Sequence, residues 1–206
     1  PRRLERSRWL GLQVRSLLAL VVVAEEGSFV QAARRLGYSR STISHQIAQL
    51  EAAIGESLLV RGSGSRSVIV TPAGKVVVAH GRAVLKLLDN AEAQLAELKG
   101  TEACVLFGSG FLANTGVIAA LATDGVVASD ALNHASIVDG CRLARAKTLV
   151  YPHGEVPAEA DVIVTDAVFS MDGDIAPLEA LVETGARVIV DEAHATGVIG
   201  PQGRGL

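Results

Sequence analysis

The chain has 206 residues, of which 49% are hydrophobic and 20% charged, and its formal net charge at pH 7 is −3. This apolar content is sufficient for a packed core, but the longest apolar run, Leu17 to Ala24, is well below the roughly 18–20 residues that span a bilayer. No secretory signal pattern opens the sequence. The two cysteines, Cys104 and Cys141, do not make a disulfide framework or a metal cluster. We therefore expect a cytoplasmic chain with no membrane or metal partner.

Charge divides the chain into two parts of opposite sign. Residues 1–99 contain 14 Lys and Arg and 8 Asp and Glu, a net charge of +6, whereas residues 100–206 contain 5 and 14, a net charge of −9. A basic part favours a polyanionic partner, and two ordinary solvated surfaces are the alternative. The change near residues 98–100 predicts two domains with separate functions.

Three helices are predicted after a basic tail over residues 1–11. The apolar run from Leu17 to Ala24 forms the first helix, and Gly27 ends it. Ser28 caps a second helix, whose apolar residues follow the spacing of one buried stripe: Phe29, Ala32, Ala33 and Leu36. After a turn at Gly37, Ser39 caps a third helix with an inward face of Ile43, Ile47, Leu50 and Ile54.

Polar side chains lie on or near the outward face of the third helix, at its N-terminal end: Arg40, Ser41, Thr42, Ser44, His45 and Gln46. Hydrogen-bond donors and acceptors of this kind read base edges and phosphates. Two helices joined by a short glycine-containing turn are typical of a helix-turn-helix. A solvated polar face on an ordinary helical bundle is the alternative.

A hairpin and a long helix are predicted next. Two short apolar strands, over residues 58–61 and 68–70, enclose a Gly- and Ser-rich loop, and Arg61 and Arg66 lie where a wing reaches a phosphate backbone or minor groove. Pro72 begins a helix that continues to residue 98. Its apolar residues are spaced 4-3-4-3, as in a heptad seam: Val84, Leu88, Ala91, Leu95 and Leu98. One helix cannot bury such a seam alone, so the pattern predicts a homodimer.

Residues 12–98 resemble the LysR-type transcriptional regulators. The resemblance is carried by the stretches 25–29, 32–36, 44–47, 50–51 and 71–74, together with Gly55 and Arg61. It implies a winged helix-turn-helix domain over 12–71, a linker and dimerisation helix over 72–98, and duplex DNA as the partner. The implied DNA contacts are Arg40, Ser41, Thr42, Ser44, His45 and Gln46, with Arg61 and Arg66 near the wing. Ser41 stands where the family often has proline, and nothing after residue 99 resembles the family's effector domain.

The second part of the chain has the pattern of a parallel α/β sheet. A glycine-rich turn over residues 108–111 opens a helix, where backbone N–H groups can bind a phosphate, although a plain turn is the alternative. β-Branched runs over 162–165 and 187–190 predict buried parallel strands. The second run ends in the sequence Asp-Glu-Ala-His at 191–194, at a strand end where such sheets bind ligands. These four residues also spell a helicase box, but the phosphate-binding loop that a helicase needs is absent.

Residues 97–206 resemble the α-oxoamine synthases, most closely the branch that acts in biotin synthesis. The stretches 100–103, 109–114, 130–136, 168–174, 191–197 and 200–205 carry the resemblance in order. These enzymes use pyridoxal 5′-phosphate to condense an amino acid with an acyl-CoA. The resemblance implies a partial pyridoxal-phosphate-dependent transferase domain over 99–206, which is an incomplete fragment of the large α/β domain.

The resemblance also implies a role for each of six cofactor-binding residues. Gly110 and Phe111 would lie at the cofactor phosphate, and His134 would stack on the pyridine ring. Ser170 and His194 would contact the region of the ring oxygen. Asp191 would pair with the protonated pyridine nitrogen and keep the ring an electron sink. Each of these residues taken alone is as compatible with an ordinary structural role.

Two departures from the family bear on activity. The family's lysine that binds the cofactor covalently lies in a Ser-x-x-Lys setting beyond 191–194, and neither Lys99 nor Lys147 matches it. We therefore expect no catalytic residue, no covalent attachment and no activity in the chain as it stands, with amino acid and acyl-CoA as substrates only if the chain continues. The segments 151–161 and 177–185 are also shorter than expected, which predicts clipped crossover helices.

Three interpretations of function follow from the sequence. The first is a sequence-specific DNA-binding regulator whose working part is residues 12–98. The second is a piece of a pyridoxal-phosphate-dependent acyltransferase. The third is a joining of two unrelated proteins by gene fusion or assembly error, since the helix before residue 99 fits either family.

Overall fold

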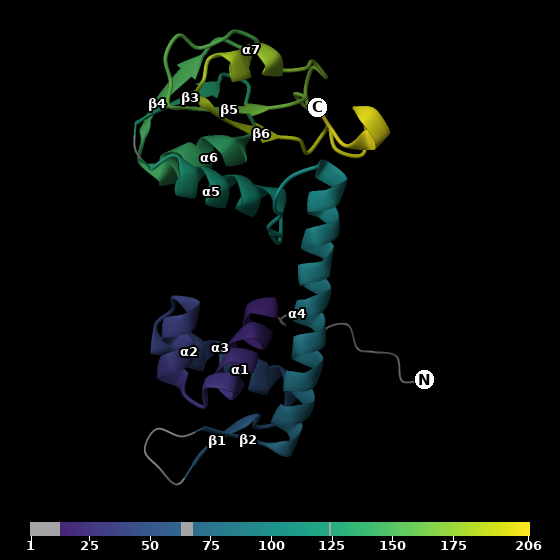
Figure 1. Ribbon diagram of the computed structural model, residues 1–206. Helices are drawn as coiled ribbons and strands as arrows, with labels where there is room; N and C mark the ends of the chain where they lie inside the picture. The colour runs from purple at the N-terminus through teal and green to yellow at the C-terminus, as the bar shows by residue number, and fades with distance from the viewer. Residues whose placement is uncertain (1–12, 63–67, 124) are drawn as a thin grey trace. The chain divides into compact units, whose positions relative to one another are not determined.

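The computed structural model describes residues 13–62, 68–123 and 125–206, and the chain forms two compact units, residues 1–91 and 92–206. Helix α4 (Pro72–Lys99) contributes residues to both units (Figure 1). None of the described helices is long and apolar enough to cross a membrane. Each unit has its own hydrophobic core, so we describe the two units separately.

Unit 1 is a bundle of three helices followed by a hairpin and the first part of α4. Its elements are α1 (Val14–Glu26), α2 (Phe29–Leu36), α3 (Arg40–Ile54), β1 (Leu59–Arg61) and β2 (Val68–Val70). The strands β1 and β2 pair in antiparallel register. The hydroxyl oxygens of Ser28 and Ser39 accept backbone N–H groups at the starts of α2 and α3, as the sequence predicts.

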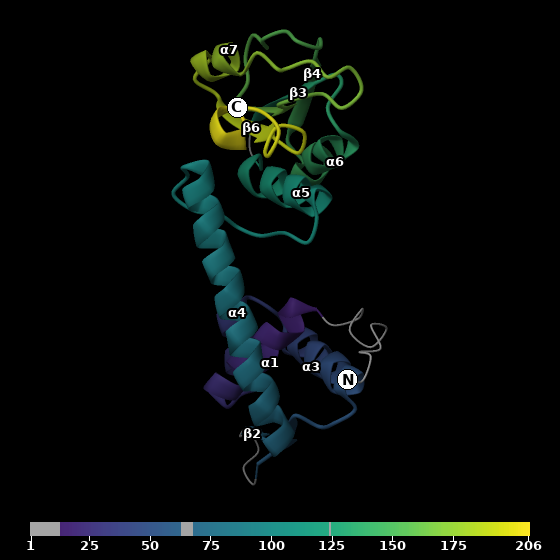
Figure 2. The same cartoon turned by 90° about the vertical axis from the view of Figure 1, so that its right-hand side faces the viewer.

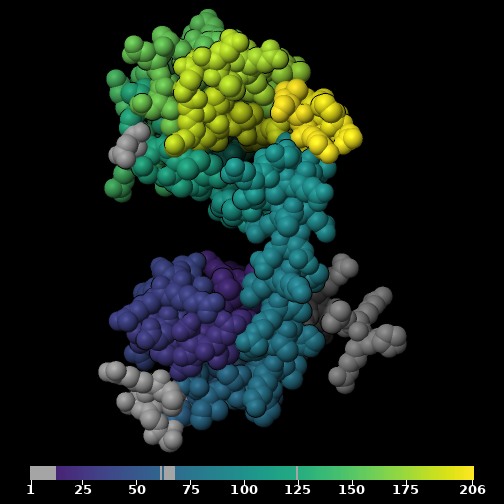
Figure 3. Space-filling view, in the orientation of Figure 1, coloured from purple at the N-terminus to yellow at the C-terminus, as the bar shows by residue number. Residues whose placement is uncertain are grey.

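The core of unit 1 lies between α1, α3 and the start of α4. Its largest fully buried side chains are Leu20, Ile43, Leu50 and Leu58. Figure 3 shows the purple and blue atoms of the first helices packed against the first part of α4. The close approach depends on Gly74, because a Cβ there would lie 2.1 Å from the backbone oxygen of Leu58. Thr71 caps α4 by accepting the N–H of Gly74 at 2.9 Å.

Unit 2 contains a four-stranded parallel sheet with helices on both faces. The strands are β3 (Val126–Asp130), β4 (Lys147–Tyr151), β5 (Val162–Asp166) and β6 (Arg187–Asp191), in the spatial order β4-β3-β5-β6. Helices α5 (Gly110–Leu121) and α6 (Ala135–Ala144) cover one face, and the short α7 (Leu178–Glu183) covers part of the other (Figures 1 and 2). A short 3-10 turn, η2 (Pro201–Gly203), follows.

The β-branched runs of unit 2 are explained by burial on both sheet faces. Val162 and Val164 of β5 pack in the cluster with α5 and α6, whereas Ile163 between them packs in the cluster with α7. Two such faces require apolar residues at every position of a strand. The connection from β4 to β5 contains no helix among its residues 152–161, and α7 has only six residues. These short crossovers agree with the sequence expectation.

The strand order places a switch point between β3 and β5. From β3 the chain adds β4 on one side, and then crosses back to add β5 and β6 on the other. The helices α6 and α7 that follow β3 and β5 therefore diverge to opposite faces of the sheet. In open parallel sheets the ligand-binding crevice forms at the carboxyl ends of the strands at such a point.

Helices α5 and α6 pack closely because α6 has a glycine where they cross. A Cβ at Gly140 would lie 2.9 Å from the Cδ1 and 3.0 Å from the Cβ of Ile118, and 3.1 Å from the backbone oxygen of Asn114. Ile118 is fully buried, so it cannot move aside into solvent. A side chain at position 140 would push α5 away from α6.

We predict that Gly140→Ala lowers the free energy of unfolding of unit 2 by about 1–3 kcal/mol, the usual cost of overpacking, although alanine is ordinarily the better helix residue. Gly116→Ala is the matched control, because a Cβ there meets only the ring edge of Phe107, an exposed side chain that can move. Denaturant unfolding followed by circular dichroism measures the free energy of unfolding of both variants. Equal stability of the two variants would contradict the packing argument.

Candidate nucleic-acid interface and candidate cofactor site

Helix α3 presents a polar face opposite its buried stripe. Ile43, Ile47 and Leu50 are buried, and the predicted contact residues on the other face are exposed: Arg40, Ser41, Ser44 and His45. Thr42 is half-buried, and its hydroxyl lies 2.8 Å from that of the capping Ser39. This arrangement leaves a cation, two hydroxyls and an imidazole open to a ligand at the start of the helix.

Gln46 differs from the sequence expectation. Its residue is only 5% exposed, and its Oε1 has no hydrogen-bond partner among the described residues. The reason is helical spacing: Gln46 follows Ile43 by three positions and precedes Leu50 by four, so it shares their side of the helix. Its expected place on the outward face was therefore wrong.

The two wing arginines are only partly described. The backbone of Arg61 pairs with Val68 in the hairpin, and its side chain lies outside the described part. Arg66 lies outside the described residues altogether. Their expected contacts with DNA stay predictions.

In unit 2, the polar residues at the carboxyl end of the sheet form a hydrogen-bond network around Asn114. The Nδ2 of Asn114 on α5 donates to Oδ2 of Asp191 at 2.6 Å and to the hydroxyl of Ser136 at 2.9 Å. That hydroxyl lies 2.6 Å from Nδ1 of His134, the N-cap of α6. The network thus joins two predicted site residues, His134 and Asp191, through Asn114 and Ser136.

A second set of bonds fixes His134 to the end of β5. Nδ2 of Asn133 donates to the backbone oxygen of Val164 at 2.8 Å and to the hydroxyl of Ser129 at 2.9 Å, and its Oδ1 accepts the N–H of Asp166 at 2.9 Å. The carboxylate of Asp166 accepts the N–H of His134 at 2.8 Å. The loop that begins α6 is therefore held to β5 across the switch point.

Asp166 is a buried carboxyl group opposite Asp191, its register partner on β6. Burial raises the pKa of Asp166, and the negative charge of Asp191 raises it further, while the N–H of His134 and the nearby imidazole of His194 act in the opposite direction. The proximity of His194 to Asp166 places a third predicted residue in the same region.

The other predicted residues lie at the starts of nearby segments. Gly110 and Phe111 form the first turn of α5, which Ser109 caps, and Phe111 is exposed. Ser170 is exposed in a turn after β5, and among the described residues no hydrogen bond links its side chain to the other predicted residues. Asn114, Asn133, Ser136 and Asp166 were not assigned roles from the sequence, although all but Asp166 lie within the motifs that carried the resemblance.

The end of α4 is tied to the loop that follows β6. Nζ of Lys99 contacts a carboxylate oxygen of Glu192 and the backbone oxygen of Arg204, and lies 3.2 Å from the hydroxyl of Thr196. The second carboxylate oxygen of Glu192 accepts the N–H of Leu206 at 2.8 Å. Lys99 is thus used to hold this loop.

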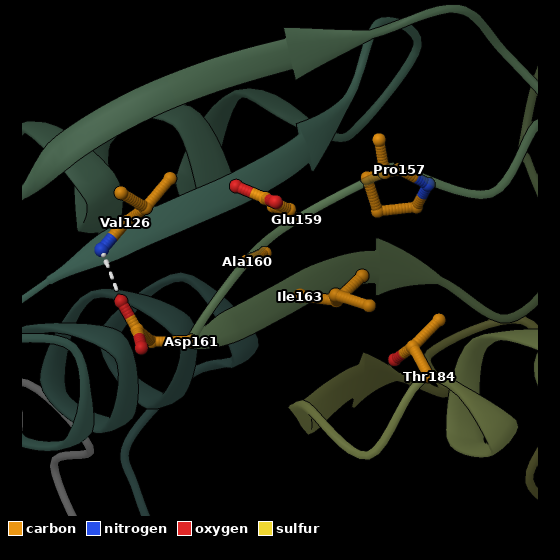
Figure 4. A pocket seen from close by; sticks show the side chains of 8 residues that line it. Val126, Pro157, Glu159, Ala160, Asp161, Ile163 and Thr184 are labelled. Carbon is orange, nitrogen blue, oxygen red and sulfur yellow. Dashed lines mark hydrogen bonds between the residues drawn. The ribbon is translucent and has the colours of Figure 1, made fainter.

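A pocket of about 370 Å³ lies elsewhere in unit 2 (Figure 4). It is at the amino ends of β3 and β5, and its lining includes Val126, Glu159, Ile163 and Thr184. The carboxylate of Asp161 accepts the N–H of Val126 at 2.8 Å at its edge. None of the predicted site residues lines it. Among the described residues there is also no group of three or more His, Cys, Asp or Glu side chains that could hold a metal ion.

Residues 81–205 match the family described as aminotransferase class I and II, which is more than half of the chain. The chain belongs to this family. Residues 14–75 match a second family, the bacterial regulatory helix-turn-helix proteins of the lysR family. Both resemblances that the sequence indicates are confirmed. Residues 76–80 between the two matches lie within α4, so the aminotransferase match begins well before residue 99.

Curated aminotransferase relatives are 8-amino-7-oxononanoate synthases. That of Geobacter sulfurreducens is 53% identical over 130 residues, which covers 55% of this chain and 33% of the relative. A putative 8-amino-7-oxononanoate synthase of Syntrophotalea carbinolica is 49% identical over 139 residues, which covers 59% of this chain and 36% of the relative. The chain thus spans about a third of the length of these relatives.

Solved structures support the same aminotransferase fold. The 8-amino-7-oxononanoate synthase from Francisella tularensis is 34% identical with a TM-score of 0.53, covering 57% of this chain and 38% of that one. The serine palmitoyltransferase of Sphingomonas wittichii is 42% identical with a TM-score of 0.51, covering 55% of this chain and 33% of that one. The α/β unit is therefore part of a pyridoxal-phosphate transferase fold, and these relatives depend on pyridoxal phosphate.

The residues of the aminotransferase unit fit this cofactor. A Cβ at Gly110 would meet nothing within 4 Å, so there is open space beside the first turn of α5, where N–H groups attract a phosphate. The carboxylate of Asp191 is oriented by bonds from Asn114 and from the N–H of Ala193 at 2.8 Å. Its oxygens keep lone pairs for a protonated ring nitrogen. His134 is anchored through Nδ1, and its residue is exposed.

We predict a pH-dependent contribution to stability from Asp166. A carboxyl group whose pKa is raised by folding destabilises the folded state when it is charged, so its cost is absent at low pH and grows as pH rises through the raised pKa. Asp166→Asn keeps the acceptor for His134 and removes the charge. The unfolding free energy of this variant relative to wild type should therefore increase between about pH 4 and pH 7.

Denaturant unfolding at several pH values measures this difference. Glu155→Gln, which removes the charge of an exposed carboxylate with no ion pair among the described residues, is the matched control and should show no such trend. Parallel pH profiles for wild type and Asp166→Asn would contradict the burial argument.

Proposed function

We propose that this chain binds duplex DNA sequence-specifically through α3 and regulates transcription. The observation that carries the proposal is the two-sided character of α3: a fully buried apolar stripe and, on the other face, the exposed Arg40, Ser41, Ser44 and His45 at the N-terminal end. The match of residues 14–75 to the lysR family supports it. A cytoplasmic location, where bacterial DNA is accessible, is part of the proposal.

A homodimer through α4 belongs to the same proposal. Val84, Leu95 and Leu98 of the predicted seam are each more than a third exposed, so this apolar stripe is available to a second copy. Two copies would carry two α3 helices to two half-sites of an operator.

The DNA-binding proposal is tested by titrating the full chain into duplexes with a randomised central segment and measuring fluorescence anisotropy at several salt concentrations. We expect affinity to fall steeply with salt, since phosphate contacts release counterions. Arg40→Ala should weaken binding and reduce the slope of log K against log salt by about 0.9. Arg142→Ala removes the same charge from an exposed side chain on α6 and should leave the affinity and the salt slope unchanged. Binding that is absent or independent of salt would overturn the proposal.

We propose as a second function that the α/β unit holds pyridoxal 5′-phosphate. The network that connects His134 and Asp191 through Asn114 of α5 favours it, because these two groups suit the ring and the ring nitrogen of one cofactor. The first turn of the same helix suits its phosphate. His194 and Ser170 would lie near the ring oxygen. When bound, the cofactor supplies an electron sink. Condensation of an amino acid with an acyl-CoA, as in 8-amino-7-oxononanoate synthase of biotin synthesis, is the activity proposed for this site.

Equilibrium dialysis of the full chain with pyridoxine 5′-phosphate tests the cofactor site. This probe lacks the aldehyde of the cofactor, so it does not react with surface lysines. Asp191→Asn should weaken binding by about tenfold or more, since it removes the charge that faces the ring nitrogen. Glu155→Gln is again the control and should bind like wild type. Equal binding by both variants would contradict the assignment of Asp191.

A further inference from the structure

His153 lies between two carboxylates at the carboxyl end of the sheet. It follows β4, and its Nδ1 is 3.0 Å from Oδ1 of Asp130 at the end of β3. Its Nε2 is 2.6 Å from Oδ2 of Asp174, in the segment after β5. The ring also meets the ring of Phe169 edge-on, with centroids 4.4 Å apart. His153, which follows β4, thus connects the end of β3 to the segment that follows β5.

The Asp130 side of this contact is a fixed acceptor. The side chain of Asp130 is 2% exposed, and its carboxylate also accepts the N–H of Leu132 at 2.8 Å and that of Gly154 at 3.1 Å. Both oxygens are used as acceptors, so Nδ1 of His153 must be the donor.

The Asp174 side depends on the second proton of the ring. A neutral imidazole with its proton on Nδ1 has only a lone pair at Nε2, and a carboxylate cannot donate to it. Both contacts therefore exist together only when His153 is protonated. Its hydrogen bond to Asp130 raises the pKa of His153, and the bond to Asp174 raises it further. Tyr151, the remaining titratable group beside Asp130, stays neutral because burial raises its pKa to about 12.

Asp174 belongs to a hairpin over residues 168–175. Val168 pairs with Ile175, the N–H of Phe169 donates to the backbone oxygen of Asp174 at 3.0 Å, and the N–H of Gly173 donates to that of Phe169 at 2.8 Å. Phe169 is buried. This hairpin carries Ser170. The contacts of His153 with Asp174 and Phe169 therefore also position Ser170.

We propose that His153 is a positioning residue whose protonated ring bridges Asp130 and Asp174 and so holds the hairpin with Ser170 at the carboxyl end of the sheet. The relevance of this bridge to a ligand rests on the proposed cofactor site. At a pH below the ordinary pKa of histidine, His153 contacts both Asp130 and Asp174. The Asp174 arm of the bridge is lost as pH rises through the raised pKa of His153, while the Asp130 arm remains.

Hydrogen exchange of the full chain without any ligand tests the bridge. The amides of Phe169 and Gly173 report on the hairpin, and their protection factors, corrected for intrinsic exchange, are compared at about pH 6 and about pH 9. Wild type should lose up to about fivefold protection at the higher pH, as expected for a partly exposed ion pair. In Asp174→Asn the side-chain amide can donate to a neutral Nε2 or accept from a protonated one, so protection should be kept at both pH values.

His153→Asn separates the bridge from general folding. The asparagine amide can still donate to Asp130 but is too short to reach Asp174. Protection of the hairpin should therefore be low at both pH values, while amides in β3 and β5 stay protected. His80→Asn changes an exposed histidine on α4. It is the matched control and should behave like wild type. A wild-type hairpin without pH dependence, or a His153→Asn hairpin that behaves like wild type, would overturn the proposal.

Dialysis with pyridoxine 5′-phosphate at the same two pH values distinguishes this proposal from the cofactor site itself. If wild type binds pyridoxine 5′-phosphate, His153→Asn should bind it several-fold more weakly at the lower pH. Its affinity should also differ less between the two pH values than that of wild type. Identical binding by wild type and His153→Asn would overturn the positioning role. If wild type does not bind but the exchange results hold, the bridge is supported and the proposed cofactor site fails.

Discussion

The carboxyl ends of β3 and β5 are held together by one asparagine side chain. Asn133 bonds to Ser129 on β3 and to the backbone of β5 on both sides of Thr165, and so closes the switch point of the sheet. With Asn133 fixed, the adjacent N–H of His134 reaches Asp166, and α6 begins where Ser136 can meet Asn114. The side chain of Asn133 extends the contact between β3 and β5 beyond their backbone pairing, which ends at Ser129 and Val164.

The carboxylates at the strand ends of unit 2 are oriented mainly by backbone and amide N–H donors. Asp130 and Asp166 both accept backbone N–H groups from the segments that follow β3, and Asp191 accepts an amide from α5 and an N–H from its own loop. Backbone donors do not move or titrate, so the negative charge stays at fixed positions at the strand ends. This electrostatic environment suits a ligand with a cationic ring nitrogen, and it agrees with the protonated His153 proposed beside Asp130.

The sequence was sufficient to predict the elements whose causes are local. The apolar stripe of α3, the serine caps and the β-branched strands all depend on residues within a few positions of one another, and all are present. Gln46 was misplaced because its residue type was weighed above its spacing from Ile43 and Leu50. The ties of Asn133 to Asp166 and of His153 to Asp130 join residues 20 or more positions apart. Their partners are set by strand order, which no local pattern in the sequence determines.

The last residue of helix α4 is bonded to the segment that follows β6, the strand that carries Asp191. Lys99 forms an ion pair with Glu192, the residue after Asp191. Among the described residues no other cation lies within ion-pair distance of Glu192. Neighbouring residues of an extended strand end point to opposite sides, so Asp191 faces Asn114 while Glu192 faces the helix end. The Lys99–Glu192 ion pair therefore fixes the last turn of α4 to the residue next to Asp191. Helix α4, within which the first family match ends and the second begins, therefore also ends beside the residue that follows the carboxylate proposed to face the ring nitrogen.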